Sequence, residues 1–88
     1  MLFFITQTHE PGNCPKDMGG FRKVFINEKV EGVVLKDVYV EHGSHMIFYI
    51  VETDNYDNLV RFLEPGMLKC TSSISPVSSL PVSEILKK

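Results

Sequence analysis

Three histidines and two cysteines are the side chains of this 88-residue chain with the most chemical potential. Imidazole and thiolate groups are the usual ligands of zinc, copper and iron, and the usual bases and nucleophiles near neutral pH. They fall in three places: His9 and Cys14 lie near the start, His42 and His45 share a turn, and Cys70 lies near the end. Their spacing along the sequence does not indicate that any of them are in contact. Which of these side chains lie close together therefore depends on the fold.

A predicted β-hairpin is the central element that would position these groups. Its arms, residues 33–40 and 45–52, are rich in β-branched and aromatic side chains. The turn between them contains Gly43, which can take the positive φ that hairpin turns often need. The second arm is apolar on both faces, which is typical of a central strand that is covered on both sides.

Turn residues and apolar periodicity divide the rest of the chain. Gly19-Gly20 disfavours a continuous first helix, Asp54 is the predicted N-cap of the second, and Pro76 places the last strand at a sheet edge. The predicted elements are a strand over 1–9, a short or broken helix within 16–26, the two hairpin strands, a helix over 54–63, and a strand over 68–77.

This order of elements predicts an α+β, ferredoxin-like βαββαβ fold. Its four-stranded antiparallel sheet has the order 4-1-3-2, with both helices on one face, and residues 1–77 form a single domain. The first and third strands carry apolar side chains on both faces, so the uncovered face should pack against a second copy, sheet to sheet. We therefore expect a homodimer, leave higher homo-oligomers open, and expect the tail 78–88 to pack on the partner subunit.

The same topology predicts where the histidines and cysteines lie. Strand 1 runs antiparallel to strands 3 and 4, so all five residues fall toward one end of the sheet. This arrangement suggests metal ligation by His9, Cys14, His42 and His45, or a general base at His9 or His45. The alternative is that the histidines are ordinary solvated residues and the cysteines ordinary core residues, and both interpretations stay open.

The opening run Leu2-Phe3-Phe4-Ile5-Thr6-Gln7-Thr8-His9, the Pro/Gly loop after it, the strand pair and the helix before Pro65-Gly66 resemble the dimeric α+β-barrel superfamily. That superfamily includes small monooxygenases and muconolactone-isomerase-like proteins. The resemblance implies a small-molecule pocket between sheet and helices. The ligand-binding residues expected for such a pocket are Phe4, Thr6, Thr8 and Phe62.

The first functional hypothesis is a homodimer that binds a small molecule and needs no cofactor. A second is a cofactor-independent enzyme of monooxygenase or isomerase type, with His9 or His45 as general base. A third is a protein that holds a transition metal such as zinc or iron, and a fourth is a structural dimer with no pocket. The sequence does not decide whether the chain is an enzyme.

Composition narrows the partners and the location. The net charge is −2 and the nine Lys and Arg residues are scattered, which disfavours nucleic acid. No run approaches the ~18 apolar residues of a membrane-spanning helix, and no signal sequence is evident, so no membrane partner is expected. Two cysteines without a Cys-x-x-Cys pair suggest reduced thiols in the cytoplasm.

Overall fold

A four-stranded antiparallel sheet forms the centre of the structure, a computed structural model that describes residues 1–80 except the side chains of Asp17 and Met18. In chain order the elements are β1 (Leu2–Thr8), the 3₁₀ turns η1 (Pro11–Asn13) and η2 (Pro15–Met18), α1 (Phe21–Val24), β2 (Val34–Glu41), β3 (Met46–Glu52), α2 (Tyr56–Leu63), the 3₁₀ turn η3 (Glu64–Gly66), and β4 (Thr71–Val77).

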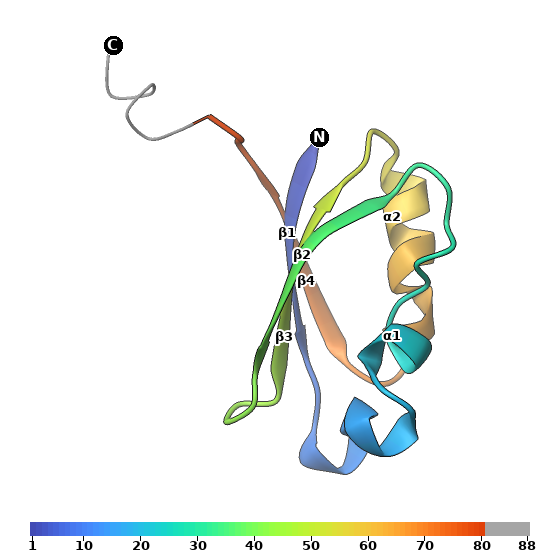
Figure 1. Ribbon diagram of the computed structural model, residues 1–88, viewed down its shortest axis with the longest axis vertical. Helices are drawn as coiled ribbons and strands as arrows, with labels where there is room; N and C mark the ends of the chain where they lie inside the picture. The colour runs from blue at the N-terminus through green and yellow to red at the C-terminus, as the bar shows by residue number, and fades with distance from the viewer. Residues whose placement is uncertain (81–88) are drawn as a thin grey trace.

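The strand order is β2-β3-β1-β4, which is the predicted order 4-1-3-2 read from the other edge. All three strand pairs are antiparallel, and the topology is compatible with a ferredoxin-like fold. Figure 1 shows α1 and α2 together on one side of the sheet, while no helix of residues 1–80 lies on the opposite face. The architecture predicted for one copy of the chain is therefore confirmed.

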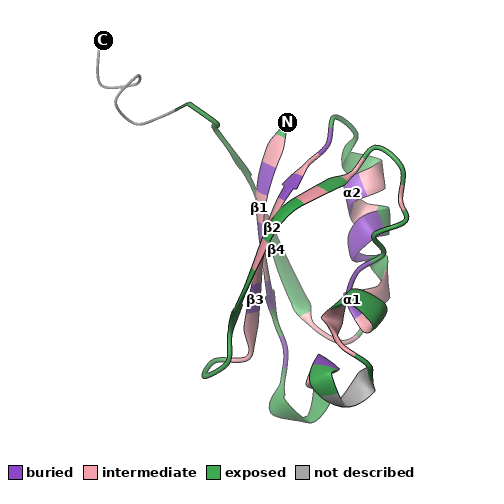
Figure 2. Cartoon of the chain, in the orientation of Figure 1, coloured by how far each residue is buried: buried purple, intermediate pink, exposed green. Residues whose placement is uncertain are grey.

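The core lies between the sheet and the two helices. Strand alternation sends one set of side chains toward the helices, and along β1 and β3 these are buried while their neighbours are only partly covered (Figure 2). The helix α2 packs onto this face through its buried residues Leu59, Phe62 and Leu63. The buried apolar residues are Phe3, Ile5, Phe25, Ile26, Ile47, Tyr49, Val51, Leu59, Phe62 and Leu63.

The other face of the sheet, here called the open face, is apolar in its central strands. Phe4 and Phe48 stack there with ring centroids 5.9 Å apart and stay only partly buried. The open-face partners along β1 and β3 are Leu2, Phe4, Thr6, Thr8, Met46, Phe48, Ile50 and Glu52. Within the described residues, this face has no covering layer.

Two glycines divide the segment between β1 and β2. Gly19 and Gly20 both have φ of +99°, a conformation that L side chains rarely adopt. They separate η2 from the single turn of α1, so the prediction of a broken helix is confirmed.

The N-cap of the second helix lies one residue later than predicted. Asn55, not Asp54, is its N-cap, and the Asn55 side chain accepts a hydrogen bond from the Asn58 backbone N–H at 3.2 Å. Asp54 instead pairs with the N-terminal amine at 2.9 Å. The N-cap prediction was therefore wrong by one position.

The two edge strands each carry an irregularity. β4 begins at Thr71 rather than at residue 68, because the backbone N–H groups of Lys69 and Cys70 donate to the Gly66 carbonyl and form a turn. Pro76 lies in this edge strand, as predicted. On the other edge, the β2–β3 register shifts between Leu35 and Asp37, which marks a bulge.

No helix in the described part of the chain is long and apolar enough to cross a membrane. The predicted tail over 78–88 lies largely outside the described residues, which end at Leu80.

Candidate functional site

His9, Cys14 and His45 meet at one end of the sheet. The Nε2 atom of His9 lies 3.3 Å from Nδ1 of His45. One ring nitrogen of each histidine and the Cys14 Sγ all lie within 4.8 Å of one another. Figure 1 shows the reason: the 3₁₀ turns that follow β1 and the turn between β2 and β3 lie at the same end of the molecule.

Backbone pairing fixes the two histidines beside each other. The His9 N–H donates to the His45 carbonyl at 3.1 Å, which extends the β1–β3 ladder by one bond beyond the strands. His45 has φ of +52°, the only positive φ at a non-glycine position in the described structure. The sequence pattern favoured Gly43 for this conformation, but the left-handed residue is His45. Such a conformation costs about 1–2 kcal/mol for a residue with a Cβ atom, and strain of this kind is often found at functional sites.

His9 continues the helix-facing side of β1 and is buried, with 7% of its surface exposed. Its ring packs edge-on against Phe25, with ring centroids 5.4 Å apart. The Nδ1 atom of His9 has no hydrogen-bond partner among the described residues. A buried polar atom without a partner lowers the stability of the fold by about 1–3 kcal/mol. Burial, and next the neighbouring charge of His45, lowers the pKa of His9 below its usual value of 6.5. His9 is therefore held neutral, the form that accepts a proton or binds a metal ion.

Cys14 is placed by two 3₁₀ turns. It ends η1, where its N–H donates to the Pro11 carbonyl at 3.3 Å, and it also precedes the first residue of η2, Pro15. The fixed φ of proline favours such tight turns, which explains why this short loop holds a defined shape. The thiol is free and half-buried.

These three side chains open onto a cavity of about 310 Å³, here called the histidine pocket. Its wall combines apolar groups from both layers of the fold with one cationic and one acidic side chain. The lining residues are His9, Cys14, Pro15, Lys16, Gly20, Phe21, Val40, Glu41, His42, His45 and Ile47.

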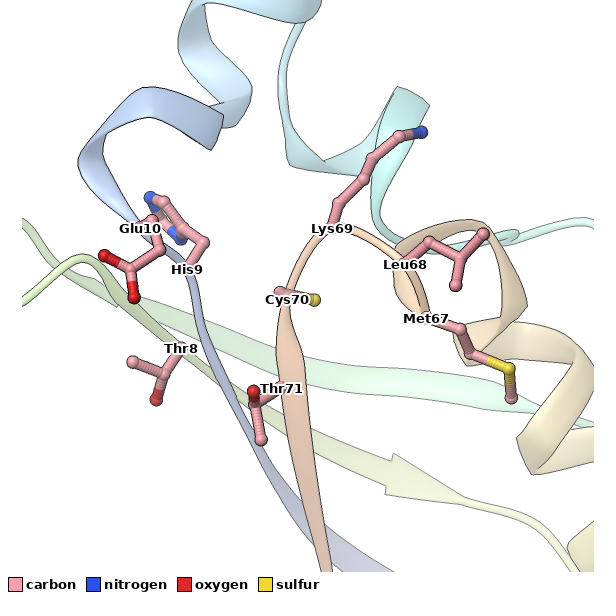
Figure 3. Close-up of a pocket in the computed structure, with 8 residues that line it drawn as sticks. All are labelled: Thr8, His9, Glu10, Met67, Leu68, Lys69, Cys70 and Thr71. Carbon is pink, nitrogen blue, oxygen red and sulfur yellow. The ribbon is translucent and has the colours of Figure 1, made fainter.

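A second hollow lies on the other side of His9. It is a shallow groove of about 420 Å³ between the end of β1 and the turn before β4. Figure 3 shows Thr8 and Thr71 on the two strands, with His9 and Cys70 just beyond them. The Cys70 thiol donates to the Gly66 carbonyl at 3.2 Å, and burial raises its pKa. A protonated thiol that already has an acceptor is a poor nucleophile or ligand, so this groove carries less chemistry than the histidine pocket.

The structure separates the residues that the sequence grouped as metal ligands. His9, Cys14 and His45 form a cluster of potential metal ligands. His42 lines the histidine pocket but does not belong to this cluster. Cys70 belongs to the other groove.

The four predicted ligand-binding residues lie in three different places. Phe4 and Thr6 are on the open face, Phe62 is in the core with 1% of its surface exposed, and Thr8 lines the second groove. In the described structure they do not surround one cavity. The reason is strand alternation, because even-numbered residues of β1 point away from the helices.

Sequence reasoning missed most of the pocket wall. Lys16, Phe21, Val40 and Glu41 come from three separate segments, and no spacing rule links them. The position of Val40 could have been predicted from the hairpin. Val40 pairs with Ile47, a helix-facing residue of β3, so its side chain is expected on the same side of the sheet.

A buried polar network next to the site also went unrecognised. Tyr49 donates to Gln7 Oε1 at 2.6 Å, and Gln7 Nε2 donates to the Phe25 carbonyl at 3.4 Å. The signal that could have revealed it is a glutamine in register with the otherwise apolar face of β1. Because Phe25 contacts His9, this network helps to fix the floor of the site.

Comparison with known proteins adds no relative to this picture. No family model, no curated protein and no solved structure matches the chain. The likeness to the dimeric α+β-barrel superfamily accordingly remains one of element order, and the site has to be interpreted from its own geometry.

Proposed function

We propose that this chain binds a small, mainly apolar molecule in the histidine pocket. The observation that carries this proposal is a cavity of about 310 Å³ in which apolar walls surround a few convergent polar groups. Small-molecule sites generally have this composition and volumes from about 300 Å³ upward. The sequence predicted a pocket between the sheet and the helices, lined by Phe4, Thr6, Thr8 and Phe62. The pocket proposed here has other lining residues and lies at one end of the sheet.

The wall of the pocket suggests what kind of molecule would fit. Phe21, Val40 and Ile47 offer apolar surface, and His45 and Lys16 offer hydrogen-bond donors. A small aromatic or aliphatic group with one carboxylate or hydroxyl would satisfy both. The carboxylate of Glu41 in the same wall disfavours a ligand with several negative charges.

The test uses benzoate and cyclohexanol as probes and amide chemical shifts of the full chain as readout. At millimolar probe we expect shifts confined to the pocket residues. Val40→Trp should abolish them, because the larger side chain fills the cavity. The matched control is Leu68→Trp, at a fully exposed position beside the second groove. Shifts that are absent, or that survive Val40→Trp, would refute the proposal.

We propose in addition that two copies associate through their open faces. The support is the apolar surface on β1 and β3, in which Phe4 and Phe48 are stacked but only partly buried. Four strands of about seven residues span roughly 19 by 24 Å at ordinary strand spacing and rise. The product of these two lengths is about 450 Å², which is the flat area of one sheet face without the additional surface of its side chains. This area is of the same order as the ~800 Å² that each partner buries in a stable interface.

The mass in solution tests the dimer. We expect twice the chain mass of 10.0 kDa by light scattering at micromolar concentration. Phe48→Lys should give monomers, because it places a charge in the centre of the apolar face. Ser72→Lys is the control, since this exposed residue of β4 pairs with Gln7 on the helix-facing side. A monomeric wild-type chain would rule the dimer out.

A second candidate function is catalysis by the histidine pair. The observation that favours it is the contact between His9 Nε2 and His45 Nδ1, together with the lowered pKa that keeps His9 unprotonated and so able to accept a proton near neutral pH. If the pocket turns over a substrate, kcat/KM should fall below the pH at which His9 gains its proton. A rate without such an acid limb would exclude His9 as the base.

A cytoplasmic location is also proposed. It is supported by the two cysteines, both of which are free thiols in the structure. Thiol counting in cells lysed under acid quench would check this proposal, and oxidised cysteines would argue against it.

A further inference from the structure

We infer that His9, Cys14 and His45 bind a transition-metal ion, with zinc as the ion of choice. This inference does not depend on an organic ligand entering the pocket. It depends on three side chains whose ligand atoms lie within 4.8 Å of one another. The site would be of the three-ligand type, with one coordination position left for water or a small molecule.

The spacing of the two imidazoles fits one shared ion. Zinc–nitrogen bonds of about 2.0–2.1 Å place two tetrahedral nitrogen ligands about 3.3–3.4 Å apart. His9 Nε2 and His45 Nδ1 lie 3.3 Å apart. Zinc–sulfur bonds of about 2.3 Å require about 3.6 Å between nitrogen and sulfur. A distance of up to 4.8 Å between the Cys14 Sγ and a histidine nitrogen would have to shorten by up to about 1.2 Å, which a rotamer adjustment can provide.

A second observation concerns the tautomer of the buried His9 ring. His9 is more than nine-tenths buried, yet its Nδ1 atom has no hydrogen-bond partner among the described residues. No carboxylate or carbonyl of that part of the chain selects one tautomer, so either ring nitrogen is free to present a lone pair. The proton of the neutral ring can therefore sit on Nδ1, which leaves the lone pair on Nε2, the atom that faces His45.

The surroundings also suit a cation of borderline softness. Two imidazoles and one thiolate are ligands that zinc and its neighbours in the transition series prefer over magnesium or calcium. The Glu41 carboxylate in the same pocket wall adds negative charge. All three ligand residues line the pocket, so the fourth position would border the cavity.

The backbone presents the ligands without further folding. The His9 N–H bond to the His45 carbonyl holds the two residues beside each other, and His45 lines the same pocket as Ile47, two residues further along β3. Pro11 and Pro15 hold the loop that carries Cys14. A preformed site of this kind binds metal without a large ordering cost.

The experiment uses the untagged full chain, kept reduced and freed of metal with a chelator. Zinc is titrated by calorimetry, and the protein-bound zinc is counted by mass spectrometry. We expect one zinc per chain and a higher thermal midpoint in its presence, because an ion that binds only the folded state stabilises it. Titration with cobalt should give a thiolate-to-metal charge-transfer band.

Two ligand variants and two matched controls decide the assignment. Cys14→Ser and His45→Asn should each weaken zinc binding by at least about 100-fold, the upper end of losses seen for residues that only support a ligand. Asparagine tolerates the left-handed backbone, so His45→Asn removes the imidazole without disturbing the turn. Cys70→Ser and His42→Ala replace the remaining cysteine and the remaining histidine of the chain and should leave the affinity unchanged within about threefold. His9 is left intact because it contacts the core.

Each outcome supports or overturns the site. Loss of zinc and of the cobalt band in Cys14→Ser, with both controls intact, supports it. A wild-type chain that binds no zinc at micromolar concentrations overturns it, and so does binding that the two ligand variants retain. The benzoate and cyclohexanol measurements are made without metal, so failure of the zinc site leaves the proposed small-molecule pocket to be judged on its own data.

Discussion

The buried bond between Tyr49 and Gln7 offers the sharpest test of how this fold supports its site. Tyr49→Phe removes the hydroxyl that donates to Gln7 Oε1 at 2.6 Å, and both residues are fully buried. The ring itself stays, so the change in packing is small. The variant leaves Gln7 Oε1 buried without a donor. Gln7 also binds the Phe25 carbonyl, and the Phe25 ring contacts His9.

The expected cost follows from the asymmetry of buried hydrogen bonds. Removing one partner costs about 1–3 kcal/mol, because the other stays desolvated and unpaired. Removing both partners is closer to neutral. We therefore expect Tyr49→Phe and Gln7→Met each to lower the free energy of unfolding by about 2 kcal/mol. The double variant should lose about 1–2 kcal/mol rather than about 4, and some of that loss comes from the Phe25 carbonyl, which loses its donor at 3.4 Å.

Urea unfolding of the four proteins measures this coupling directly. A single loss of about 2 kcal/mol corresponds to a drop in Tm of roughly 8–16 °C for a domain of this size. Tyr39→Phe is the control, because this hydroxyl is exposed and should contribute less than about 0.5 kcal/mol. If the two single losses simply add in the double variant, the bond is not the coupled unit described above and the reasoning fails.

Three further predictions concern the same layer. Gly66→Ala should destabilise the fold by about 1–3 kcal/mol in thermal melts, because a Cβ atom there would lie 2.8 Å from a backbone oxygen, whereas Gly43→Ala, with open space around it, should be nearly neutral. Burial raises the pKa of Tyr49 far above its usual value of 10.0, so the folded chain holds this proton more tightly than the unfolded one. Stability should then fall as the pH rises above about 10, and alkaline absorbance titration should show one tyrosinate fewer before unfolding than after it; an equal count would refute this. The lowered pKa of His9 has the opposite sign: the unfolded chain binds the proton first, so stability should fall as the pH drops below 6.5, and a flat urea midpoint between pH 7 and 5 would contradict it.

Much of the fold could be predicted because its signals are local. Apolar side chains on both faces of residues 1–9 and 45–52 identified the two central strands, and Gly19-Gly20 identified the break in the first helix. Once these elements were known, handedness and connectivity left few ways to order the sheet. The errors lie at element ends, such as the N-cap at Asn55, where neighbouring residues of similar chemistry compete for one role.

The candidate site was predictable only in part. Antiparallel topology correctly brought His9 and His45 to one end of the sheet, but it brought His42 and Cys70 there as well. Which of them converge depends on side-chain direction. His45 also has a left-handed backbone, a conformation for which hairpin chemistry had favoured a glycine.

The two edges of the sheet determine how this chain can safely assemble. An exposed strand edge is a template for endless strand addition, the route to fibrils. Here one edge is interrupted by the bulge next to Lys36, and the other contains Pro76, which has no N–H group to donate. Strand addition at either edge is therefore hindered, whereas the apolar open face has no covering layer among the described residues. In the proposed dimer the two open faces would cover each other, so that this assembly would be closed and could not grow further.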